Sequence, residues 1–130
     1  MDKRTMISIV DDDESVRDAT ANLMRAAGYT PQAFPHARAF LESSHVSDTD
    51  ILIADVQMPG MSGLELHDAL LDAGKHIPTL LITAYPDERM RSRALHAGVI
   101  GYLTKPFNES ELLDTIQSVL RSVKTRSIEQ

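Results

Sequence analysis

Short apolar segments alternate five times with amphipathic segments along this chain, and that order limits the folds the chain can adopt. Residues 6–10, 51–54 and 79–82 are nearly continuous apolar runs, rich in Ile, Leu and Val. A fourth run spans residues 99–103, and a weaker one at residues 30–34 has prolines inside and directly after it, as edge strands do. Nearly continuous apolar runs are typical of parallel strands that helices cover on both faces.

The segments between these runs have the signals of helices. Apolar residues recur in them every three or four positions; Gly28 and Gly98 follow two of them as stops, and Ser62 begins another with the capping-box pattern Ser-Gly-Leu-Glu. Strict alternation predicts an α/β fold: a doubly wound (βα)5 sandwich, with a five-stranded parallel sheet in the order 2-1-3-4-5 and helices on both faces. Residues 1–123 are expected to form this domain, and residues 124–130 a polar C-terminal tail or the start of a linker.

Polar residues follow the strands where each one ends. Asp11 and Asp12 come directly after the first strand, Asp55 after the third, Thr83 after the fourth and Lys105 shortly after the fifth. In the order 2-1-3-4-5 the first and third strands are neighbours, and such folds bind ligands beyond the carboxyl ends of their strands. We therefore expect these five side chains to converge at one edge of the sheet, although up to 94 positions separate them in sequence.

Carboxylates that converge in this way need a counter-charge. At separations of about 5 Å and an effective dielectric near 20, each pair costs roughly 3 kcal/mol, so a proton or a cation must settle among them. Oxygen ligands without a nearby His or Cys suit Mg²⁺, with Mn²⁺ as a substitute. Lys105 adds a positive charge and Thr83 a hydroxyl donor, so the space fits a phosphoryl group. Asp55, beside that space, can be the nucleophile that becomes an aspartyl phosphate.

Four stretches, IVDDDESVR, ILIADVQMPGMSGLEL, LLITAY and GYLTKPF, resemble the receiver domain of two-component response regulators (the CheY-like domains) in order and spacing. The resemblance covers essentially the whole chain. It implies that Asp55 accepts a phosphoryl group from the phosphohistidine of a sensor histidine kinase. It also implies that Asp12 binds the metal directly, Asp11 mainly through a metal-bound water, and Gln57 through its backbone carbonyl.

The same resemblance implies roles for the remaining site residues. Lys105 contacts a phosphoryl oxygen, and Thr83 contacts others together with the backbone amide of Ala84. On phosphorylation the Thr83 hydroxyl moves toward the phosphoryl group and the ring of Tyr102 turns inward, which changes the surface of the fourth helix, fifth strand and fifth helix. A phosphorylation-dependent homodimer through this surface and a cis peptide bond before Pro106 are also expected.

Two further side chains are expected beside the phosphoryl group. Gln57 and Tyr85 stand two residues after Asp55 and Thr83, and their side chains are expected to influence how long the phosphoryl group survives against water.

Each candidate also has a simpler interpretation. Asp11 and Asp12, standing alone, would be caps of the first helix, and Asp13, the third acid of the row, is expected to be such a cap. Thr83 and Lys105 alone would be a strand-end threonine and a solvated lysine. Asp55 alone would be a turn residue, and Tyr102 would be a static, partly buried strand aromatic. The five histidines show no metal-ligand spacing and are expected in solvated or capping positions. The arginines of the fourth helix (Arg89, Arg91 and Arg93) are expected on a solvated face, with a partner contact as the alternative.

Composition excludes several functions. The net charge of −6 argues against direct nucleic-acid binding by this domain and against binding to anionic membranes. The chain has no Cys, so disulfides, Cys-type zinc sites and thiol nucleophiles are excluded. No apolar run approaches the roughly 20 residues that span a bilayer, and residues 1–4 lead into a strand rather than a signal peptide. A cytoplasmic protein is expected.

Three other functions fit parts of the pattern. A phosphorylation-independent interaction domain would lack the lysine, the threonine or the acidic pair, all of which are present here. A flavodoxin-type carrier would need a hydroxyl- and glycine-rich loop after the first strand, where this chain has Asp-Asp-Asp-Glu-Ser. A phosphohydrolase with an aspartyl nucleophile normally has a D-x-D motif after the first strand, whereas Asp55 follows the third.

The output of the domain is a separate question. The stretch VDDDESVRDATANLMRAAGY is similar to receivers of the FixJ/LuxR type, whose attached domain binds DNA, so control of transcription is expected. A stand-alone receiver that acts by protein–protein interaction is the alternative. In both cases a signalling protein is expected rather than an enzyme, because it would catalyse only its own phosphorylation and dephosphorylation.

Overall fold

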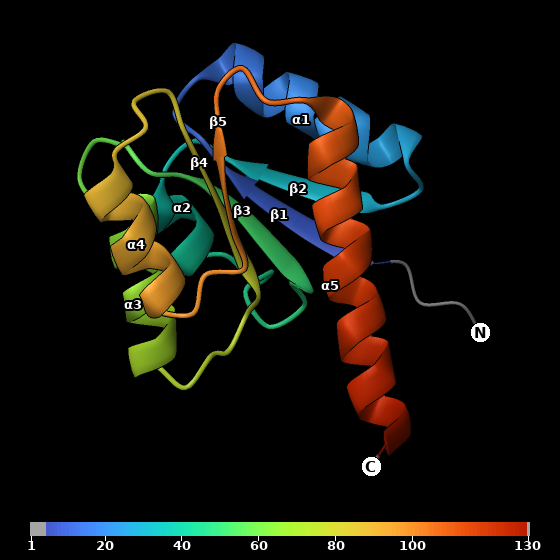
Figure 1. Ribbon diagram of the computed structural model, residues 1–130. Coiled ribbons are helices and arrows are strands. Elements are labelled where there is room, and N and C mark those ends of the chain that lie inside the picture. Colours follow the sequence, from blue (N-terminus) through green and yellow to red (C-terminus); the bar gives the residue numbers. More distant parts are fainter. Residues whose placement is uncertain (1–4, 130) are drawn as a thin grey trace.

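The strands form one parallel sheet in the order β2-β1-β3-β4-β5, as the alternating sequence predicts (Figure 1). The computed structural model describes residues 5–129, and their side chains as far as Ser122. The strands are β1 (Met6–Val10), β2 (Thr30–Phe34), β3 (Ile51–Asp55), β4 (Thr79–Thr83) and β5 (Gly101–Thr104). The helices are α1 (Glu14–Ala26), α2 (Ala37–Leu41), α3 (Gly63–Asp72), α4 (Glu88–His96) and α5 (Glu109–Glu129).

Helices cover both faces of the sheet, and this explains the unbroken apolar runs of the central strands. Helices α1 and α5 lie on one face, and α2, α3 and α4 lie on the other (Figure 1). Successive side chains of β3 enter opposite cores: Leu52 packs with the residues under α2, α3 and α4, and Ile53 packs with those under α1 and α5. Every residue of β3 and β4 is buried, whereas the proline-containing β2 lies at the edge of the sheet and is only partly buried.

Side-chain caps define where the helices begin. Asp13 is the N-cap of α1, and its Oδ1 accepts a hydrogen bond of 3.2 Å from the backbone N–H of Val16. Ser62 and Glu65 form a reciprocal capping box at the start of α3. Both predicted caps are thus confirmed. Among the histidines, His67 differs from the prediction, because it is buried on α3 rather than solvated or capping.

The fifth strand begins two residues later than predicted, at Gly101 instead of residue 99. The backbone N–H of Val99 donates to the carbonyl of Ala94 at 3.1 Å, so Val99 closes the end of α4. Its buried side chain fills the core under the helices. The apolar character of Val99 therefore reflects helix-end packing and not pairing with β4.

Helix α5 continues to Glu129, and its backbone shows no break at the predicted boundary after residue 123. The division into a domain of residues 1–123 and a tail or linker of residues 124–130 stays a prediction.

Gly63 links the start of α3 to the end of β3. A Cβ at this position would lie 2.5 Å from the backbone oxygen of Asp55 and 2.9 Å from Leu81 Cδ2, closer than packed atoms allow. We expect Gly63→Ala to lower the free energy of unfolding by about 1–3 kcal/mol, the usual cost of overpacking. Urea denaturation measures this. Ser118→Ala, on the exposed face of α5, is the control and is expected to change stability by less than about 0.5 kcal/mol. An equal urea midpoint for Gly63→Ala and wild type would show that the backbone shifts to make room for the methyl group without loss of stability.

Candidate functional site

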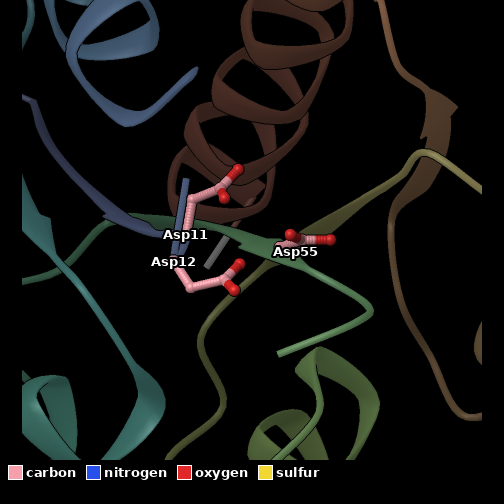
Figure 2. A group of neighbouring side chains, drawn as sticks. All are labelled: Asp11, Asp12 and Asp55. Carbon is pink, nitrogen blue, oxygen red and sulfur yellow. The ribbon is translucent and has the colours of Figure 1, made fainter. Parts of the chain in front are cut away.

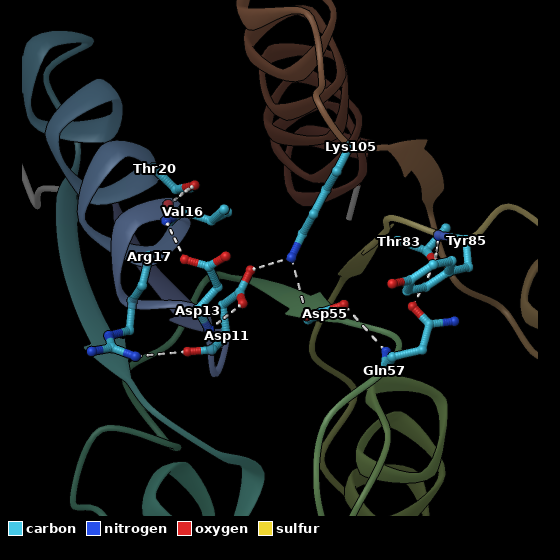
Figure 3. Close-up of polar contacts among 10 residues, drawn as sticks. All are labelled: Asp11, Asp13, Val16, Arg17, Thr20, Asp55, Gln57, Thr83, Tyr85 and Lys105. Atoms are coloured by element: carbon cyan, nitrogen blue, oxygen red, sulfur yellow. Dashed lines mark hydrogen bonds and ion pairs between the residues drawn. The ribbon is translucent and has the colours of Figure 1, made fainter.

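Four strands deliver polar residues to the same edge of the sheet. Asp11 directly follows β1, Asp55 is the last residue of β3, Thr83 is the last residue of β4, and Lys105 directly follows β5. Figure 3 shows Lys105 reaching from the end of β5 toward Asp11 and Asp55, with Thr83 on the far side of Asp55. The chain therefore assembles this site from segments that lie far apart in sequence.

Three carboxylates gather at the ends of β1 and β3. Each of Asp11, Asp12 and Asp55 has a carboxylate oxygen within 4.8 Å of the other two (Figure 2). Asp11 is 3% exposed and Asp55 is 6% exposed, whereas Asp12 is open to solvent. These side chains thus converge as the strand order predicts. A cation could approach them from the side of Asp12, and their oxygen atoms suit a hard divalent ion.

The ammonium group of Lys105 lies between the two buried carboxylates. Its Nζ is 3.0 Å from Asp11 Oδ2 and 3.1 Å from Asp55 Oδ2. Burial by itself lowers the pKa of Lys105, but the hydrogen bonds to Asp11 and Asp55 and the negative charges of these two residues together outweigh burial and raise its pKa above the ordinary value. Lys105 is therefore a fixed positive charge beside Asp55 at any pH near neutrality.

The hydroxyl group of Thr83 points to Gln57. Thr83 is fully buried, and its Oγ1 donates to Gln57 Oε1 at 2.6 Å (Figure 3). The same oxygen accepts a hydrogen bond of 3.0 Å from the backbone N–H of Tyr85. The backbone N–H of Gln57 in turn donates to Asp55 Oδ1 at 3.2 Å. Gln57 thus touches Asp55 through its backbone and Thr83 through its side chain. Ala84 follows Thr83 at the same edge and is exposed.

Tyr102, on β5, packs its ring against the core under α2, α3 and α4. Its hydroxyl oxygen is buried and has no hydrogen-bond partner in the described part of the chain. Burial raises the pKa of Tyr102, and the nearby backbone of Asp87 opposes this effect. The Lys105–Pro106 peptide bond is cis.

The sequence model of the response regulator receiver domain matches residues 7–117. The chain belongs to this receiver family. Receiver domains work with sensor kinases in two-component systems, and response regulators are mainly signalling proteins. Many of these regulators control transcription.

Similar receivers are known in sequence and in structure. The response regulator protein TodT of Pseudomonas putida is 38% identical over 120 residues, which are 92% of this chain and 53% of TodT. The transcriptional regulatory protein FixJ of Rhizobium meliloti is 33% identical over 111 residues, which are 85% of this chain and 54% of FixJ. The receiver chain thus spans about half the length of these curated relatives.

Solved structures agree with the fold. The response regulator StyR is 40% identical with a TM-score of 0.85, covering 98% of this chain and 65% of the StyR chain. The chemotaxis protein CheY4 of Vibrio cholerae is 29% identical with a TM-score of 0.81, covering 90% of this chain and 99% of CheY4. None of the helices in residues 5–129 of the receiver combines the length and apolarity that a membrane crossing requires.

Asp55 has the most strongly shifted acidity in the receiver site. Burial is the largest cause and raises the pKa of Asp55 from 3.8 to about 6, and the negative charge of Asp11 adds to the rise. The hydrogen bond from Lys105 lowers the pKa but does not cancel these effects. A second cation near Asp55 would favour the carboxylate form.

The raised pKa of Asp55 predicts a pH-dependent stability in EDTA. Because the folded-state pKa of about 6 lies above 3.8, the stability from protonated Asp55 is fully present below pH 3.8 and is lost as pH rises through about 6. Asp55→Asn cannot ionise, and we expect its free energy of unfolding to exceed that of wild type by about 1–3 kcal/mol near pH 8 and by about half as much near pH 5. Urea denaturation at both pH values measures the difference. A gain in stability that is equal at both pH values would contradict this prediction, because it would not come from ionisation of Asp55.

Two contacts of the receiver site were not predicted from the sequence. The Nη1 of Arg17 donates to the backbone oxygen of Asp11 at 2.9 Å and supports the loop after β1. Its place in the first turns of α1, close behind the acids, is the signal that could have pointed to it. The second contact is the hydrogen bond between Thr83 and Gln57, which are 26 positions apart. The sequence predicts that the Gln57 side chain lies beside the phosphoryl group, but no sequence pattern marks its pairing with Thr83.

Proposed function

We propose that this receiver is a phosphorylation-dependent switch in which Asp55 accepts a phosphoryl group from a sensor histidine kinase in a Mg²⁺-dependent reaction. The observation that supports it best is the ammonium group of Lys105 shared between the buried carboxylates of Asp11 and Asp55. An arrangement with one nucleophilic carboxylate oxygen, one fixed cation and a cluster of three carboxylates suits phosphoryl transfer better than flavin binding or a phosphohydrolase reaction.

The acidic cluster fits a magnesium ion. The carboxylates of Asp11, Asp12 and Asp55 and the backbone carbonyl of Gln57 would hold it, and Mn²⁺ has the oxygen preference to replace it. When bound, the ion supplies positive charge that offsets the repulsion among the carboxylates and the phosphoryl oxygens. Asp12 is exposed, so the ion can keep water ligands on that side.

The reaction requires only one bond exchange. A carboxylate oxygen of Asp55 attacks the phosphorus of the phosphohistidine, the phosphorus–nitrogen bond breaks, and the imidazole leaves with the bonding electron pair. Lys105 would then bind a phosphoryl oxygen in place of the Asp55 carboxylate oxygen. The backbone N–H of Ala84 and the hydroxyl of Thr83 would donate to the other oxygens.

The switch proposed for this receiver couples the site to a distant surface. The Thr83 hydroxyl moves to the phosphoryl group, the ring of Tyr102 turns further inward, and the surface of α4, β5 and α5 changes shape. A homodimer through this surface is part of the proposal. Helix α4 carries exposed arginines (Arg89, Arg91 and Arg93), which would be available for a partner contact.

The proposed output is transcription control by an attached DNA-binding domain in a cytoplasmic regulator. The names of the relatives TdiR and FixJ, both transcriptional regulatory proteins, support it. A stand-alone receiver that acts through protein contacts is the second candidate. The division into a domain of residues 1–123 and a polar C-terminal tail or the start of a linker at residues 124–130 belongs to the same proposal.

The direct test is to locate the phosphoryl group. Wild-type protein is incubated with acetyl phosphate and Mg²⁺, the acyl phosphate is reduced with borohydride, and the digested peptides are analysed by mass spectrometry. The modification is expected on the peptide that contains Asp55 and at that residue. Modification at a histidine or a hydroxyl side chain instead would overturn the proposed reaction.

A further inference from the structure

The hydroxyl of Thr83 is occupied on both sides by hydrogen bonds. It accepts from the backbone N–H of Tyr85 at 3.0 Å and donates its hydrogen to Gln57 Oε1 at 2.6 Å. Thr83 is fully buried, so water does not offer it an alternative acceptor. Gln57 Oε1 is therefore the acceptor for the hydroxyl hydrogen of Thr83 in the structure.

A phosphoryl group on Asp55 would compete with Gln57 for the same hydrogen. A threonine hydroxyl has a single hydrogen to donate, and the oxygens of a phosphoryl group are acceptors only. Thr83 must therefore release Gln57 Oε1 before it can donate to the phosphoryl group. The cost of release falls on Thr83, because Gln57 is exposed and its amide can turn to water.

Gln57 contacts both Asp55 and Thr83, so it can link the resting state of the receiver to its phosphoryl-bound state. Its backbone N–H donates to Asp55 Oδ1 at 3.2 Å, so the residue lies directly beside the proposed acceptor. Its side chain extends from there to Thr83 at the end of the neighbouring strand (Figure 3). One residue thus contacts the phosphorylation site and restrains the group that must respond to it.

We propose that the side chain of Gln57 is a latch, which holds the Thr83 hydroxyl in the resting position and sets how readily the receiver enters its phosphoryl-bound state. This inference rests on the proposed function. Gln57 is a positioning residue here, because it acts through Thr83. The latch differs from a direct effect of Gln57 on the phosphoryl group or on water, since it requires the Thr83 hydroxyl.

A double-mutant cycle separates the latch from a direct effect. Gln57→Met keeps the length of the side chain and removes the acceptor, and Thr83→Val keeps the shape and removes the hydroxyl. The dissociation constant for beryllofluoride in the presence of Mg²⁺ is measured by calorimetry for wild type, both single variants and the double variant. Beryllofluoride is the probe because it mimics a phosphoryl group on a carboxylate.

Gln57→Met is expected to bind beryllofluoride about threefold to tenfold more tightly than wild type, the factor that one net hydrogen bond represents. In the Thr83→Val background the same substitution is expected to change nothing. An equal gain in both backgrounds, or no gain in either, would overturn the latch. A wild type that does not bind beryllofluoride would overturn the proposed function, and the latch with it.

The resting contact has its own readout, which needs no phosphoryl analogue. In nuclear magnetic resonance spectra of the wild type, the hydroxyl proton of Thr83 is expected to exchange slowly enough with water to be observed. The signal is expected to vanish in Gln57→Met, with a shift of the Tyr85 amide resonance. Identical exchange in the two proteins would show that Gln57 does not restrain the hydroxyl. Circular dichroism of each variant controls for the fold.

Discussion

Asp55→Asn is expected to abolish phosphoryl uptake from acetyl phosphate in the presence of Mg²⁺. The neutral amide has no anionic oxygen to attack phosphorus, and it also withdraws one carboxylate from the acidic cluster. We expect the initial rate to fall by about a thousandfold or more, as when other nucleophiles are removed. Intact-protein mass spectrometry over a time course measures incorporation. The variant is expected to fold, because Asn has nearly the shape of protonated Asp.

The matched control for this experiment is Asp114→Asn, which makes the same chemical change on the exposed face of α5. It is expected to incorporate phosphate at the wild-type rate. Equal incorporation by Asp55→Asn and wild type would remove Asp55 from its proposed role, and would direct attention to another side chain of the cluster.

Removal of the divalent ion is expected to have an effect nearly as large. In EDTA the wild type is expected to take up the phosphoryl group at least about a hundredfold more slowly than with Mg²⁺. Lys105 alone must then balance the negative charge of the carboxylates and of the incoming phosphoryl oxygens. Asp12→Asn is expected to raise the Mg²⁺ concentration for half-maximal rate by about tenfold or more, since it removes an exposed ligand without disturbing the core. Initial rates over a Mg²⁺ titration measure both effects.

Asp13→Asn is the control for the metal experiment. Asp13 belongs to the same acidic row, but its side chain caps α1, and Asn caps helices about as well. Its Mg²⁺ dependence is expected to match that of wild type. A full rate in EDTA, or equal shifts for Asp12→Asn and Asp13→Asn, would contradict the assignment of Asp12 as a ligand.

The predicted site agrees with the observed one for the residues whose positions follow from the order of the strands. Asp11 and Asp55 end neighbouring parallel strands, so their meeting at one edge follows once the order of strands is known. Local patterns also predicted the cap at Asp13, because an acid before a helix bonds to N–H groups three residues away. The predicted start of the fifth strand was wrong at Val99, because a short apolar run fits a strand and a helix end equally well.

The sequence by itself determined the class of fold, the edge of the sheet at which the acids meet and the family of the chain. The reason is that hydrophobic periodicity and the residues at strand ends can be read locally, without knowledge of how the side chains pack. Only the tertiary structure decided that Lys105 is shared between Asp11 and Asp55, and that Thr83 is held by Gln57. These pairings depend on the side-chain conformations of loop residues packed against other segments. Such conformations are set by all the neighbours at once, so no local pattern specifies them.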